Sequence, residues 1–190
     1  MPDTASTNQQ RLEQLKAFYT AGAANDRGYT LFDLWSKPDS WLERSHMFIQ
    51  WMFPLTTASA GNMYAPVLDE LTINFLRNNA SAQDNLVRSF VRFCALLGLK
   101  VINTEQGPQL AIADNFAERK TDWFTFDSHN NARITRVLTS LKLLGREDLA
   151  KLMYEGLLKL MADEPGCGIG EYAVGRWRAT MGNVADRLNR

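Results

Sequence analysis

The sequence predicts a mostly α-helical fold, a single-domain bundle of about six to eight helices with at most a minor short β-hairpin near residues 100–112. Apolar residues recur every three or four positions over most of the chain, which is the period of a helix with one buried face. Glycine and proline separate these segments. The chain has 190 residues, of which 45% are hydrophobic and 22% charged, so one domain can bury a sizeable core.

The first half of the chain contains most of the expected helices. They cover residues 9–21, 31–35, 39–52, 66–78 and 81–97. Residues 1–8 are polar and are expected to form a disordered N-terminus. Pro38 and Pro54 bound the third helix, because proline is accepted at a helix start and disfavours helical geometry in the residue before it.

The second half begins with a change of period. Around Gly107-Pro108 the helical spacing fades, and two short strands joined by a turn are expected. Two further helices are expected over residues 128–144 and 146–162. The predicted helical domain therefore spans residues 9–162.

The C-terminal segment is predicted to be an appendage to this domain. Residues 163–170, DEPGCGIG, are expected to form a glycine-rich hinge. Residues 171–190 are expected to form an amphipathic helix with one narrow apolar stripe. The stripe consists of Val174, Trp177, Met181, Val184 and Leu188.

Composition excludes several classes of protein. The net charge is zero and the isoelectric point is near 6.7, which argues against nucleic-acid binding, because nucleic-acid modules usually carry a basic excess. Two cysteines and two histidines, without a carboxylate cluster, predict neither a disulfide framework nor a metal site, and no cofactor motif occurs. The N-terminus lacks the apolar segment of a signal peptide, and no run approaches the roughly 18 apolar residues of a membrane span. A cytoplasmic protein without a transmembrane segment is expected.

The segment 41–55, WLERSHMFIQWMFPL, is apolar on nearly every side, which predicts a buried helix. His46 and Gln50 are four residues apart and would share one face of that helix, beside Trp51. Both side chains are therefore expected to be buried and hydrogen-bonded. Two interpretations remain open: a structural polar pair that fixes the packing of the helix, or part of a binding site.

The segment 129–145, HNNARITRVLTSLKLLG, also places polar residues against an apolar stripe. His129, Arg133 and Arg136 share one helical face that begins at a helix N-terminus. Guanidinium groups and the N-terminal N–H groups both favour an anion there. The alternative is that the arginines form internal ion pairs, with carboxylates such as Glu43, Glu118 or Asp127.

These two segments resemble the two signature blocks of the opioid growth factor receptor conserved region. LERSHMFIQWMFPL (42–55) is similar to the first block and HNNARITRVLTSLKLLG (129–145) to the second. Between them, Asn115-Phe116-x-x-Arg119 resembles an N-(Y/F)-x-x-R element. The resemblance covers roughly Leu31–Leu160. The long acidic and proline-rich repeats of vertebrate members have no counterpart in this sequence, and the arginine expected before the N-(Y/F)-x-x-R element is replaced by an apolar run.

The resemblance implies a shared fold and, by analogy, a receptor-like activity with an unknown ligand. Vertebrate members are described as receptors for an enkephalin peptide that act in growth control and associate with nuclear and perinuclear membranes. No enzymatic activity comes with the family, so no catalytic residue is assigned.

Three functions follow as hypotheses. The first is a non-enzymatic domain that binds a small anionic ligand or a peptide and takes part in protein interactions. Its expected ligand-binding residues are His46, Gln50, Trp51, His129, Arg133 and Arg136. The second is an enzyme that acts on an anionic or phosphorylated small molecule through these histidines and arginines. The third is a scaffold protein that docks on a protein partner or self-associates through the C-terminal stripe.

Overall fold

The computed structural model describes residues 4–182, and contacts within it divide the chain into two units. The first unit comprises Met1–Arg92 with Leu143–Gly145, and the second comprises Phe93–Lys142 with Arg146–Arg190. Residues 1–3 and 183–190 lie outside the described part, and with them Val184 and Leu188 of the predicted stripe.

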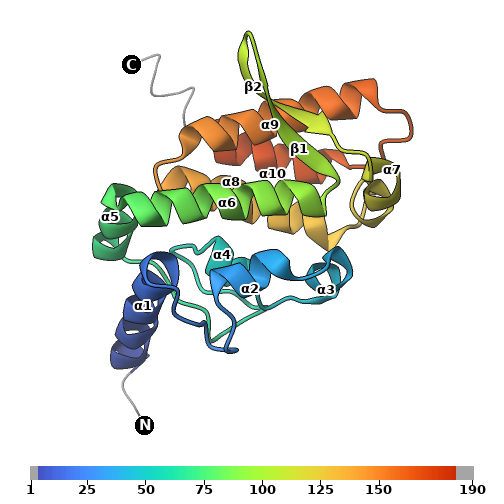
Figure 1. Ribbon diagram of the computed structural model, residues 1–190. Coiled ribbons are helices and arrows are strands. Elements are labelled where there is room, and N and C mark those ends of the chain that lie inside the picture. Colours follow the sequence, from blue (N-terminus) through green and yellow to red (C-terminus); the bar gives the residue numbers. More distant parts are fainter. Residues whose placement is uncertain (1–3, 183–190) are drawn as a thin grey trace. The chain divides into compact units, whose positions relative to one another are not determined.

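The predicted fold class is confirmed, because the described residues form ten α-helices and one two-stranded antiparallel sheet (Figure 1). The α-helices are α1 (Thr4–Thr20), α2 (Leu31–Ser36), α3 (Asp39–Arg44), α4 (Ile49–Met52), α5 (Glu70–Asn78), α6 (Ala80–Leu96), α7 (Phe116–Arg119), α8 (His129–Leu143), α9 (Glu147–Asp163) and α10 (Glu171–Gly182). A 3-10 turn, η1, covers Lys120–Asp122. The helices outnumber the expected six to eight, partly because one expected helix is broken in two and α7 is a single turn.

The core of the first unit begins on α1. Its apolar positions Leu12, Leu15, Phe18 and Tyr19 are all buried, as their helical spacing predicted. The ring of Phe18 meets the indole of Trp51 edge to face, with centroids 5.4 Å apart. Since α1 begins at Thr4, residues 4–8 of the expected disordered N-terminus are helical.

The prediction of one continuous helix over residues 39–52 is wrong. Helix α3 ends at Arg44, and α4 starts only at Ile49. Ser45 has extended geometry, with φ −86° and ψ 130°, and its hydroxyl accepts the N–H of Met47 at 3.4 Å. A serine hydroxyl that takes a backbone N–H competes with the helical hydrogen bond and so favours a break here.

Side-chain caps fix two helix starts in the first unit. Thr30 and Asp33 form a reciprocal capping box at α2, in which each side chain accepts the other residue's backbone N–H. The Asp69 carboxylate accepts the N–H of Thr72 at 2.7 Å. Helix α5 therefore begins at Glu70, four residues later than the expected start at residue 66.

The second unit contains the predicted hairpin. Strand β1 (Leu99–Thr104) pairs antiparallel with β2 (Gly107–Ile112), and Leu99 lies opposite Ile112. Strand β2 packs closely on α9 (Figure 1), because a Cβ at Gly156 would stand 2.5 Å from the side chain of Leu110.

Helix α10 packs into the second unit through its apolar stripe. Val174 and Trp177 are buried, and the Trp177 indole N–H donates to the carbonyl of Asn131 at 3.2 Å. The hypothesis that these two residues dock a partner is therefore wrong, since this chain already covers them. Ahead of α10, the N–H of Gly168 donates to Phe124 O at 3.1 Å.

Candidate functional site

The six predicted ligand-binding residues fall into two sets, one in each unit. His46, Gln50 and Trp51 belong to the first unit. His129, Arg133 and Arg136 lie on α8 in the second unit. A single pocket that uses both sets stays a prediction.

In the first set, only Gln50 and Trp51 are buried. His46 lies in the break between α3 and α4 and is exposed, so the prediction that it is buried is wrong. The Gln50 amide donates to the hydroxyl of Ser59 at 3.3 Å. The Gln50 amide oxygen and the Trp51 indole N–H are buried without a hydrogen-bond partner.

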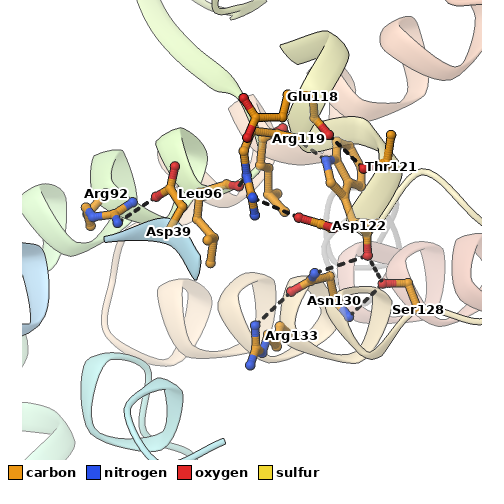
Figure 2. A network of polar contacts seen from close by, with 12 residues as sticks. Asp39, Arg92, Leu96, Glu118, Arg119, Thr121, Asp122, Ser128, Asn130 and Arg133 are labelled. Carbon is orange, nitrogen blue, oxygen red and sulfur yellow. Dashed lines mark hydrogen bonds and ion pairs between the residues drawn. The ribbon is translucent and has the colours of Figure 1, made fainter. Parts of the chain in front are cut away.

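Residues of the second signature block join a hydrogen-bond network within the second unit that also includes Arg119 and Asp122, and Figure 2 shows its members. Arg119 donates from Nε to Leu96 O at 2.8 Å and pairs with the Asp122 carboxylate at 2.8 Å. The carbonyl of Asp122 accepts hydrogen bonds from the Ser128 hydroxyl at 2.8 Å and from the Asn130 amide at 3.5 Å.

Arg133 belongs to the same network. Its side chain donates to Asn130 Oδ1 at 3.0 Å, and the residue is only 5% exposed (Figure 2). These contacts favour the structural interpretation of Arg133 over direct ligand contact. Arg136 is partly buried, and burial lowers the pKa of its guanidinium.

A pocket of about 400 Å³ lies in the first unit beside the first signature block. We call it the Trp41 pocket, and it is lined by Asn25, Arg27, Tyr29, Leu34, Trp41, Ser45, Met47 and Phe48. Its aromatic rings contact one another. The Tyr29 and Trp41 centroids lie 5.5 Å apart, edge to face, and those of Trp41 and Phe48 lie 6.4 Å apart. His46 lies between two lining residues in the chain without lining the pocket itself.

One wall of the Trp41 pocket is a hydrogen-bonded loop. Asn25 Oδ1 accepts the backbone N–H of Arg27 at 2.9 Å and of Tyr29 at 3.0 Å. The backbone N–H of Asn25 donates to the carbonyl of Tyr29 at 2.8 Å, and Gly28 completes the turn with φ +78°. These bonds fix the loop that carries the guanidinium and the phenol to the pocket.

The connection between α2 and α3, which flanks the pocket, is held by Arg92 on α6. This side chain donates to Trp35 O at 3.0 Å and to Lys37 O at 2.8 Å. It also pairs with the Asp39 carboxylate at 2.7 Å (Figure 2). Because Arg92 holds the connection between α2 and α3, it sets the spacing of Leu34 and Trp41, which come from those two helices.

The Trp41 pocket combines positively charged side chains with aromatic rings. The Lys37 ammonium lies 4.4 Å from the Tyr29 ring centroid and 5.2 Å from that of Trp41. Arg27 adds an exposed guanidinium, with Asp26 at 3.9 Å. The arrangement suits a ligand that packs an apolar group against the rings and presents a negative group at the rim.

The sequence indicated Trp41 only as part of the apolar segment 41–55, and it did not identify Asn25, Arg27 or Tyr29 as lining residues. The stretch AANDRGYT gave a loop signal, because asparagine, aspartate and glycine cluster there. A loop signal does not show which way its side chains face, so the wall of the pocket could not be read from it.

Neither a metal cluster nor a membrane span is found in the described part of the chain. Among residues 4–182, no three histidine, cysteine, aspartate or glutamate side chains are grouped as metal ligands would be. None of the helices described combines the length and apolar character that crossing a bilayer requires.

Comparisons with known proteins agree with the resemblance of the two blocks. The family model of the opioid growth factor receptor (OGFr) conserved region matches residues 14–162. Opioid growth factor receptor of Homo sapiens is 32% identical over 113 residues, which are 60% of this chain and 16% of that protein. The Mus musculus protein of the same name is 31% identical over 123 residues, 63% of this chain and 19% of its own.

A second group of relatives is similar. Opioid growth factor receptor-like protein 1 of Mus musculus is 31% identical over 117 residues, which are 62% of this chain and 24% of that protein. The matched part is thus a quarter or less of the length of these relatives. No solved structure matches the chain.

Proposed function

Because the chain belongs to the opioid growth factor receptor conserved-region family, we propose that it is a non-enzymatic binding domain whose ligand site is the Trp41 pocket. The ligand is a peptide segment that carries a bulky apolar side chain and a carboxylate. The observation that carries the proposal is the pocket itself: it is lined by three aromatic rings, a methionine and Arg27, and the Lys37 ammonium lies over two of the rings.

The position of the pocket supports a family-related role. Every lining residue lies within residues 14–162, the range that the family model matches. The pocket also lies directly beside the first signature block. The relatives are named receptors, and a receptor needs a site of this kind for its ligand.

The chemistry of the lining supports a peptide. A peptide side chain can pack against the rings of Tyr29 and Trp41, where Met47 adapts to its shape because its thioether chain is flexible. A carboxylate at the rim meets the charges of Lys37 and Arg27. The volume of about 400 Å³ accommodates one such side chain and its backbone.

The test is a titration of the full chain with short synthetic peptides, each with one aromatic residue and a free C-terminal carboxylate, followed by the methyl NMR signals of the seven methionines. We expect the Met47 signal to shift on titration, and an amidated peptide to bind more weakly. Trp41→Leu removes the central ring and is expected to weaken binding by roughly 30-fold, the effect of losing a contact worth about 2 kcal/mol.

Arg27→Gln is expected to weaken binding by up to roughly five-fold, because exposed ion pairs contribute little. Arg44→Gln is the matched control, since Arg44 is an exposed arginine that does not line the pocket. Equal affinity of the Trp41→Leu variant and the unmodified chain, with the fold preserved, would disprove the assignment.

A further inference from the structure

A second pocket, of about 560 Å³, lies in the second unit between the start of α8 and the start of α10. Its lining includes Phe126, Asp127, His129, Asn131 and Arg176, and also Tyr172 on α10. We call it the α8–α10 pocket. It shares no residue with the Trp41 pocket, and its α10 wall lies beyond residues 14–162, the range of the family match.

The rim of the α8–α10 pocket exposes two aromatic rings. Phe126 is 76% exposed and Tyr172 is 77% exposed, which is unusual for side chains of this size. One edge of the Phe126 ring lies against Gly170, because a Cβ there would stand 2.7 Å from its ring atoms. The pocket therefore presents an aromatic face to solvent, onto which a planar ligand can stack.

The polar lining favours a negative group. Helix α8 has 15 residues, and the positive end of its dipole lies at His129, on the pocket wall. The Arg176 guanidinium lies 3.4 Å from the Tyr172 hydroxyl, and its Cζ lies 6.0 Å from the centroid of that ring. The Asp127 carboxylate also lines the pocket and repels an anion, so removing its charge tests the assignment.

An independent observation at this pocket concerns Asn131, which is only 8% exposed. Its side-chain NH₂ donates to Thr125 O at 3.2 Å, which fixes the orientation of the amide. Its backbone carbonyl already accepts the indole N–H of Trp177. The side-chain oxygen Oδ1 is buried and has no hydrogen-bond partner. Because this oxygen has almost no accessible surface, a ligand donor pairs with it only after the Asn131 side chain or a neighbouring lining residue shifts.

We propose that the α8–α10 pocket binds a small aromatic carboxylate that also carries an O–H or N–H donor. Arg176, with the N-terminal end of α8, takes the carboxylate. The rings of Phe126 and Tyr172 take the aromatic group, and the donor pairs with Asn131 Oδ1. This site is separate from the peptide site proposed for the first unit.

The test uses three probes with the same ring system, added to the full chain and measured by calorimetry. The probes are 4-hydroxyphenylacetate, phenylacetate and tyramine. The order of affinity expected is 4-hydroxyphenylacetate first, phenylacetate second because it lacks the donor, and tyramine last because it is a cation. Tyramine binding as tightly as 4-hydroxyphenylacetate would overturn the proposal.

Charge variants then locate the site. Arg176→Gln is expected to weaken binding of 4-hydroxyphenylacetate by about ten-fold or more, the effect of losing a charged hydrogen bond. Asp127→Asn is expected to strengthen it, because a like charge is removed. Arg178→Gln is the matched control, because Arg178 is exposed on the same helix and does not line the pocket.

The remaining outcomes also decide the matter. Equal losses in the Arg176 and Arg178 variants, or weaker binding after Asp127→Asn, would refute the site, as would the absence of binding at millimolar 4-hydroxyphenylacetate. Trp41→Leu is expected to leave this affinity unchanged. A loss there would place the probe in the Trp41 pocket, so failure of either proposal is distinguishable from failure of the other.

Discussion

Gly98 lies at the end of α6, where a side chain is excluded for two separate reasons. Its φ of +72° is in the left-handed region, which costs other residues roughly 1–2 kcal/mol. A Cβ there would also stand 2.8 Å from Phe116 Cα and 2.9 Å from Arg119 Cβ. Because a backbone atom cannot move aside alone, this overpacking adds roughly 1–3 kcal/mol to the loss of stability. Gly98→Ala is therefore expected to lower the free energy of unfolding by about 2–5 kcal/mol.

Urea denaturation, followed by tryptophan fluorescence, measures this loss. Trp123 is a suitable reporter because its ring lies 6.5 Å from that of Phe116 and is fully buried. Gly166→Ala is the matched control, because Gly166 has φ +78° in the same unit and a methyl group added to it would meet no other atom within 4 Å. The control is expected to lose only roughly 1–2 kcal/mol. Equal losses in the two variants would show that the close approach of α7 to Gly98 contributes nothing.

Two further predictions concern ionisable groups. The Thr72 hydrogen bonds hold the pKa of Asp69 below its usual range, so this contribution to stability is present above pH ~4 and is lost as the pH falls through the lower folded-state pKa. Asp69→Asn should flatten the acid limb of a stability–pH curve, and an unchanged limb would contradict this. Burial raises the pKa of the Cys94 thiol, whereas Cys167 is partly exposed. A thiol reagent should therefore label Cys167 first in the native protein and Cys94 only after urea is added, and equal native rates would be inconsistent with this.

Helices with strong periodicity and clear ends could be predicted from the sequence. The predicted helices over residues 81–97, 128–144 and 146–162 agree with α6, α8 and α9 to within one residue at each end. Glycine ends α6 at Gly98, as expected. The break between α3 and α4 could not be predicted, because apolar spacing continues through it. A serine hydroxyl that accepts a backbone N–H lies at that break, and serine also occurs within helices, so its presence in the sequence does not mark the break.

Prediction of the candidate sites was less complete, and the reason is physical. A periodic pattern indicates which face of a helix is apolar, yet it does not show which polar residues of that face pair with neighbouring backbone. Arg133 looked like an anion ligand because it follows a helix N-terminus by one turn. In the structure it is buried and donates to Asn130. Residues that line a pocket from a loop, such as Asn25 and Tyr29, belong to no periodic pattern of apolar residues.

Signature residues of the second block and of the N-(Y/F)-x-x-R element act mainly on the architecture of the second unit. Arg119 and Asn130 both bond to Asp122; Arg119 also donates to Leu96 O on α6, and Asn130 also accepts from Arg133 on its own helix. Replacing such a residue removes a buried hydrogen bond and leaves its partner unsatisfied, which lowers stability whether or not a ligand is present. Loss of binding in an Arg133 variant would therefore not identify a ligand contact. Residues that line a pocket while being exposed, such as Arg27 and Arg176, separate binding from folding, because their substitution leaves the buried network intact.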